Sequence, residues 1–237
     1  MSETDDLDES LRRTDPDRWL ASRFIADPRM RADVVALYGY DNELGRAPRV
    51  ASNPLLGEIR LTWWREALDE IFEDRRVRSH PVALALARAA RERGLERAPL
   101  EAMIDARYRE LDPSPLARSE ARRLAEGAAG AAASLAAQVL GARTEAARFA
   151  ARDWAALWSL SLLLLAGRVR AEDADLARSA ARAGLDEART AERGLLPVTA
   201  FPAVAQATLA DAYLRGHRPS ELAKRMRLTW AVARGRI

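Results

Sequence analysis

Three residues in the first half of the chain, Tyr38, Asp41 and Asp105, have side chains suited to a binding or catalytic site. Asp41 follows an aromatic Tyr38-Gly39-Tyr40 segment, and Asp105 lies within the charged stretch MIDARYREL. Carboxylates are ligands for Mg²⁺, which also takes water and substrate phosphate oxygens. Asp41 and Glu43 are two residues apart and so cannot share a helical face. Asp41 is therefore either a lone ligand or a polar residue paired inside the protein, and an ordinary ion-pair network accounts for Asp105 equally well.

Helices must position these residues. Four prolines follow a residue that caps helices, at Asp15-Pro16, Asp27-Pro28, Asn53-Pro54 and Ser114-Pro115, which marks helix starts. No stretch alternates apolar and polar residues over the length of a strand with turns on both sides. The sequence therefore predicts an all-α fold, a single-domain bundle of about eight to ten helices over residues 15–237, after a disordered acidic tail over residues 1–14.

Ten helices are expected from these starts and from the apolar periodicity. The helix that begins at Pro28 should end near residue 46, because Pro48 disfavours the helical conformation for the residue before it. The helix after Asn53 should bury one face, and the small-residue run GAAGAAASLAAQ should permit close helix contacts. The expected ranges are 16–26, 28–46, 54–74, 81–93, 99–111, 115–140, 144–167, 172–193, 202–215 and 219–233.

Composition excludes several classes of site. The 237 residues include no cysteine and two histidines, so no disulfide framework, thiolate zinc site or multi-histidine metal site is expected. The net charge of +3 is spread through the chain without a basic run, so we expect no nucleic acid binding. The apolar run Trp154 to Ala166 is shorter than the ~20 residues that cross a bilayer. The acidic N-terminus resembles no signal or transit peptide, and we expect a cytoplasmic bacterial protein that is at most peripheral to the inner membrane.

Three motifs together resemble the squalene/phytoene synthase superfamily. They are Tyr38-Gly39-Tyr40, the segment LTWWREAL from Leu61 to Leu68, and AEGAAG from Ala125 to Gly130. The resemblance implies an isoprenoid-synthase-like helical fold. The resemblance also implies the activity of these enzymes, which join two prenyl diphosphates head to head. They hold magnesium and diphosphate between two aspartate-rich helices.

The aspartates that this resemblance implies are missing from the sequence. Counted from Tyr38, the positions where the first motif would have its aspartates are Gly45, Arg46 and Arg49. The segment where the second motif would lie, Trp154 to Ala171, has no carboxylate. Either the helices keep the fold while the cavity has closed or filled with leucine, or scattered acids replace the motifs. Those acids would be Glu58, Glu66, Asp105 and Glu110. We favour the first explanation and expect no catalytic residue and no metal ligand, with Tyr38, Asp41 and Asp105 as candidate substrate-binding residues.

Further segments are similar to the branch of the superfamily that acts in complex I assembly and lacks these aspartates. They are Asn42 to Gly45, Trp63 to Arg65, Ile104 to Arg107, and LPVTAFPA from Leu196 to Ala203. The resemblance implies a catalytically degenerate assembly factor that binds a protein partner, a subunit of respiratory complex I (NADH dehydrogenase), without a cofactor. The alternatives are an active head-to-head prenyltransferase, which would need Mg²⁺, and an isoprenoid lipid-binding protein.

The last predicted helix carries Arg225 and Arg227 beside Lys224. If these side chains are exposed, they could dock on an anionic membrane surface or on an acidic partner. The alternative is that they are merely solvated.

Overall fold

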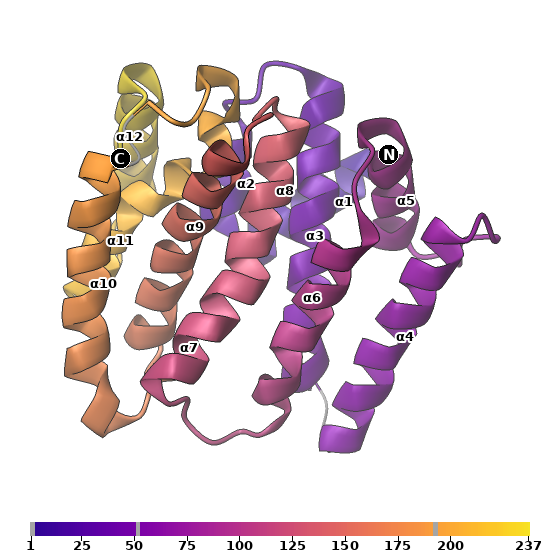
Figure 1. Cartoon of the computed structure of the whole chain (residues 1–237), viewed down its shortest axis with the longest axis horizontal. Coiled ribbons are helices and arrows are strands. Elements are labelled where there is room, and N and C mark those ends of the chain that lie inside the picture. Colours follow the sequence, from indigo (N-terminus) through magenta and orange to yellow (C-terminus); the bar gives the residue numbers. More distant parts are fainter. Residues whose placement is uncertain (1–2, 51–52, 192–193) are drawn as a thin grey trace.

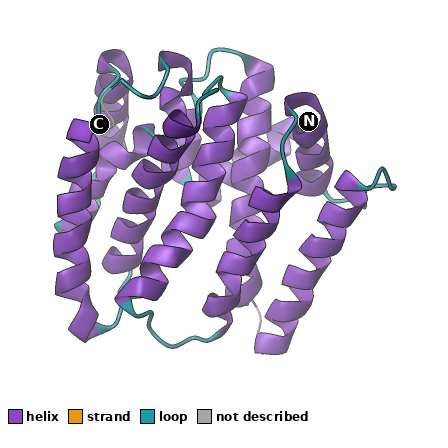
Figure 2. Ribbon diagram, in the orientation of Figure 1, coloured by secondary structure: helices purple, strands orange, loops and turns teal. Residues whose placement is uncertain are grey.

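The computed structural model describes residues 3–50, 53–191 and 194–237. These residues form helices and no strand, as Figure 2 shows, which confirms the all-α prediction. The twelve α-helices of the described residues are α1 (Glu3–Thr14), α2 (Pro16–Ser22), α3 (Pro28–Val50), α4 (Pro54–Phe72), α5 (Pro81–Arg93), α6 (Arg97–Arg107), α7 (Arg118–Ala125), α8 (Ala131–Val139), α9 (Glu145–Leu165), α10 (Ala171–Ala191), α11 (Ala210–Leu214) and α12 (Glu221–Arg234).

Two long helices organise the bundle. α3 contacts α1, α4, α5, α6 and α8, and α9 contacts α7, α8, α10 and α11. In Figure 1 the two helices lie on either side of α8, with α4 at one edge of the molecule and α10 at the other. Within the described residues, no helix has the length and apolar character that crossing a membrane requires.

The segment around Gly127 and Gly130 brings α6, α8 and α9 close together. A π-helical turn, η2 (Glu126–Gly130), joins α7 to α8. A Cβ atom on Gly127 would lie 2.8 Å from the Cβ of Ala106, and one on Gly130 would lie 3.0 Å from the carbonyl oxygen of Arg152. A side chain at either position would therefore force its neighbours apart, and the predicted close approach of helices at this run is confirmed.

The predicted buried face of α4 is confirmed. Trp64 is 4% exposed, and its ring meets Tyr40 edge to face at 5.2 Å between centroids. Asn53 caps α4 by accepting a hydrogen bond from the backbone of Leu55 at 2.8 Å. The other members of the predicted stripe, which are also buried, are Gly57, Leu61, Leu68 and Ile71.

Several predicted boundaries are wrong. α3 continues to Val50 with Pro48 inside it, because proline disfavours the helical conformation of its predecessor without forbidding it. The helix expected from 115 begins at Arg118, with Ala117 rather than Ser114 at its cap. The helix expected over 202–215 is divided into two 3₁₀ segments, η3 (Val198–Ala203) and η4 (Ala205–Leu209), followed by α11.

The tail is a further correction. Glu3–Thr14 forms α1 and packs on α3, although its acidic composition suggested disorder. Leu11 is buried there, and Asp8 accepts hydrogen bonds from the Trp19 indole and the Arg31 guanidinium. The sequence did not predict this helix because the residues that it packs against and bonds to lie on other elements.

Candidate functional site

A cavity of about 440 Å³ lies between α3 and α9. Its α9 wall is formed by Trp158, Ser159, Leu162 and Leu163, and small residues of η2 line it beside them. The charged residues of the other walls come from the α2 region, α3, the end of α6 and the residues after it, the segment after α9, and the C-terminal segment. These residues are Asp15, Asp17, Arg18, Asp41, Arg107, Glu110, Arg168, Arg218 and Lys224.

Asp41 lies at the centre of the buried charges, with 2% of its surface exposed. Its Oδ2 accepts a hydrogen bond of 2.8 Å from Arg18 Nη1, and its Oδ1 accepts one of 2.6 Å from Arg107 Nη2. Burial alone would raise the pKa of Asp41, but the two guanidinium groups outweigh burial and lower it. Asp41 is therefore an ionised carboxylate, and both of its oxygens accept hydrogen bonds. Of the two interpretations of Asp41 from the sequence, this is the polar residue paired inside the protein.

Arg107 links Asp41 to a second buried acid. Its Nη1 donates to Glu110 at 2.7 Å, and Glu110 is 6% exposed. The guanidinium also lies against Gly45 of α3, where a Cβ atom would be 3.3 Å from Arg107 Cζ. A larger residue at position 45 would therefore displace Arg107.

Arg18 closes the other side of the cluster. Its Nε donates to Asp15, whose other oxygen accepts from the Arg18 backbone at 3.0 Å and so caps α2. The guanidinium also stacks over the Tyr38 ring, 4.7 Å from its centroid. Burial raises the pKa of Asp15, with Arg18 opposing the shift. Arg18, Asp41, Arg107 and Glu110 thus form a continuous chain of buried ion pairs in which guanidinium groups and acids alternate.

Asp17 forms a second buried pair at the end of the cavity near α12. Lys224 Nζ lies 2.9 Å from its Oδ1. Its Oδ2 accepts from the Tyr213 hydroxyl and, at 3.4 Å, from the Trp158 indole. Burial raises the pKa of Tyr213, and the Asp17 charge raises it further. Lys224 is only 12% exposed, so the expectation that it lies with Arg225 and Arg227 on the surface is wrong.

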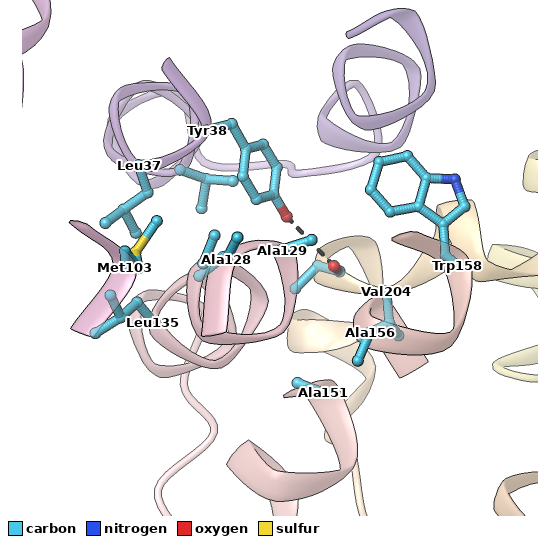
Figure 3. Close-up of a cluster of buried hydrophobic side chains, with 14 of the residues drawn as sticks. Leu37, Tyr38, Met103, Ala128, Ala129, Leu135, Ala151, Ala156, Trp158 and Val204 are labelled. Carbon is cyan, nitrogen blue, oxygen red and sulfur yellow. Dashed lines mark hydrogen bonds between the residues drawn. The ribbon is translucent and has the colours of Figure 1, made fainter. Parts of the chain in front are cut away.

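Two of the three candidate residues lie in or beside this cluster. Tyr38 is fully buried beneath Arg18, and its hydroxyl donates to the carbonyl of Ala203 at 3.3 Å, the dashed line in Figure 3. Asp41 forms the centre described above. Asp105 lies elsewhere: 62% of its side chain is exposed, and it pairs with Arg65. The structure thus separates Asp105 from Asp41.

The positions where the family resemblance implies aspartates also differ in their surroundings. Gly45 faces the cavity, whereas Arg46 is exposed and pairs with Glu43 at 2.8 Å. The side chain of Arg49 lies outside the described residues. On α9, the residues that face the cavity are apolar or neutral.

The carboxylates of this cavity do not fit a magnesium site. Mg²⁺ needs carboxylate oxygens free to enter a nearly octahedral shell, yet both oxygens of Asp41 are held by guanidinium groups. Glu110 and Asp17 are likewise paired with Arg107 and Lys224. Across the described ranges, no group of three histidine, cysteine or acidic residues could hold a metal.

Sequence reasoning missed most of the cluster. Of the scattered acids considered as replacements for the motifs, Glu110 is buried in the cluster, whereas Glu58 and Glu66 are exposed. Asp15 was recognised only as a helix cap, and Arg18 and Arg107 were not identified. The one available signal was the crowding of acids and arginines around Arg107 in MIDARYREL.

Comparisons with known proteins agree with this architecture. The chain is 30% identical over 104 residues to a bovine (Bos taurus) protein named NADH dehydrogenase (ubiquinone) complex I, assembly factor 6. That match covers 44% of this chain and 31% of the bovine protein, so the chain spans about a third of the length of its relative. The sequence pattern of the squalene/phytoene synthase family matches residues 11–166, which include α2, α3, the π-helical turn and α9. The chain belongs to the squalene/phytoene synthase family.

Proposed function

We propose that this family member no longer transfers prenyl groups and instead assists the assembly of respiratory NADH dehydrogenase, complex I, by binding one of its subunits. The observation that carries the proposal is the pairing of Asp41 with Arg18 and Arg107. Asp41 lies one helical turn before Gly45, where the family resemblance implies an aspartate, and its carboxylate is occupied by the chain's own cations.

The electrostatics of the cluster make it costly to convert into a diphosphate site. To recruit Asp41, a metal ion would have to displace two buried guanidinium groups that are hydrogen-bonded on both sides. Removing one partner from such a buried pair costs ~3–5 kcal/mol. A cluster of this kind stabilises the fold around the cavity but leaves no free acid for chemistry.

The bovine relative supports the second half of the proposal through its name, which describes an assembly factor of complex I. An assembly factor acts by binding, so loss of the acids need not abolish its function. For this chain we propose a protein partner among the complex I subunits, and a place on the cytoplasmic side of the bacterial inner membrane.

Deletion of the gene tests the proposal. Membranes of the deletion strain should contain less assembled NADH dehydrogenase on native gels, and re-expression of the chain should restore it. Pools of squalene, carotenoids or hopanoids, extracted from the same cells, should be unchanged. Normal dehydrogenase with a missing prenyl product would instead identify the chain as an active transferase.

A further inference from the structure

The outer face of α12 carries an exposed apolar stripe. Leu222, Met226 and Trp230 are 68%, 65% and 60% exposed, and their spacing of four residues places them on one side of the helix. The opposite side is buried, with Leu228 and Ala231 packed in the core. The helix is therefore fixed to the body of the protein while three large apolar side chains face outward.

Arginines flank this stripe on both sides. At 100° per residue, Arg225 lies on one side of the stripe, and Arg227 and Arg234 lie on the other; all three are exposed. The Arg234 guanidinium lies 3.9 Å from the centroid of the Trp230 ring. This arrangement combines an apolar centre with a cationic rim.

The charge of the chain is concentrated in this region. From Arg215 to the C-terminus there are seven basic residues and one acid, Glu221, so the remainder of the chain has a net charge of −3. Glu221 lies 3.3 Å from Lys224, which partly neutralises it. Lys224 faces inward to Asp17, so the positive charge that α12 itself exposes comes from Arg225, Arg227 and Arg234.

A second contact fixes the orientation of the helix. Lys224 points inward to Asp17, and Ser220 caps the N-terminus of α12 by accepting from Ala223 at 3.3 Å. These contacts hold the helix by the face opposite the stripe. Binding at the stripe would therefore need no rearrangement of the core.

We propose that α12 docks on an anionic lipid membrane. The helix would lie in the plane of the interface with Leu222, Met226 and Trp230 inserted at the headgroup boundary and the arginines among lipid phosphates. Helices with an apolar face, basic flanks and an interfacial tryptophan bind membranes in this way. The partner is recognised by its negative charge together with a penetrable apolar layer, which an acidic protein surface lacks. The docking surface would account for the membrane location in the proposed function, but it is argued from α12 alone and does not rest on the assembly role.

Flotation of the purified full-length chain with vesicles tests the assignment. The chain should float with vesicles of phosphatidylcholine and phosphatidylglycerol but not with pure phosphatidylcholine. Changing Arg225, Arg227 and Arg234 to glutamine should weaken binding about a hundredfold, since each arginine near an anionic surface contributes about fivefold. The triple change Leu222→Ser, Met226→Ser and Trp230→Ser should abolish flotation. Because all these side chains are exposed, every variant should keep the wild-type melting temperature.

A matched control uses α4, whose Leu55 and Ile59 are 58% and 55% exposed but lie beside both an acid and an arginine, Glu58 and Arg60. Leu55→Ser with Ile59→Ser should leave flotation unchanged.

Brominated lipid should quench tryptophan fluorescence in the wild type and much less in Trp230→Phe. Equal losses in the α4 and α12 variants would overturn the proposal. So would a wild type that ignores the vesicles yet is retained by polyglutamate, which would identify an acidic protein surface as the partner.

Discussion

Arg107 joins two buried acids of the cluster, Asp41 and Glu110. Arg107→Met would leave Glu110 without its cation and Asp41 with only Arg18. We expect it to lower the free energy of unfolding by about 3–5 kcal/mol, because it leaves a buried charge uncompensated. Urea denaturation at neutral pH measures this loss.

Arg46→Met is the matched control. Arg46 also pairs with an acid three residues away, but it is 55% exposed, so its loss should cost at most ~1 kcal/mol. Equal denaturation midpoints for the two variants would show that burial of Arg107 does not matter to its pair.

Asp41 should also make stability depend on pH. Although burial opposes it, pairing with Arg107 and Arg18 lowers the pKa of Asp41 in the folded state. Its stabilising contribution is thus present above the unfolded pKa of about 3.9 and is lost as the pH falls through the folded value. Asp15, whose pKa is raised by burial, has the opposite sign, so a variant of Asp41 is needed to isolate the effect.

Asp41→Asn should therefore be less stable than the wild type at neutral pH, and the two unfolding curves should converge on acidification. Protonation does to the wild type what the substitution does at every pH. Stability measured by urea unfolding over a pH series checks this, and a constant difference down to the acid limit would refute it.

Among the helices, the segment from Glu126 to Gly130 lies close to the backbone of its neighbours. A Cβ on Gly130 would lie 3.0 Å from the carbonyl oxygen of Arg152 and 3.3 Å from that of Ala125. Because backbone atoms cannot give way as a side-chain end can, Gly130→Ala should destabilise the protein by about 1–3 kcal/mol. Thermal or urea unfolding measures the change.

Gly39→Ala provides the comparison, since Gly39 also lies within a helix. Its Cβ would meet only Val82, at 3.5 Å, and alanine favours helix by up to about 1 kcal/mol over glycine. We expect this variant to be as stable as the wild type or slightly more stable. The same loss at both glycines would mean that helix packing at η2 is not the cause.

The helices were largely predictable from sequence, whereas the site was not. The face of α4 around Trp64 follows from local spacing, as do the Asp15 and Asn53 caps. The ion pairs of the cavity join residues far apart in the chain: Arg18 with Asp41, Arg107 with Asp41, and Asp17 with Lys224. No local pattern encodes such pairs, so the sequence did not identify Arg18, Asp41 and Arg107 as one cluster or show that Lys224 faces Asp17.

For the whole molecule, we expect that magnesium does not change the thermal stability, because basic side chains already neutralise the acids of the cavity. A ligand raises the melting temperature only when it binds the native state, and the acids of the cavity are already paired with Arg18, Arg107 and Lys224. Millimolar Mg²⁺ should leave the melting temperature within error of the value in EDTA, and calcium serves as a control for general ionic effects. An upward shift of several degrees with magnesium alone would contradict the interpretation of the cluster.

The central claim is that the protein, whose cavity acids are paired with basic side chains, no longer transfers prenyl groups. Turnover of a prenyl diphosphate tests this claim directly. The purified chain is incubated with Mg²⁺ and farnesyl or geranylgeranyl diphosphate, and released pyrophosphate is measured. We expect no release above the background without protein, because both oxygens of Asp41 are bound by Arg18 and Arg107. Robust release that disappears in Asp41→Asn or Asp105→Asn would contradict the account and identify the chain as an active transferase.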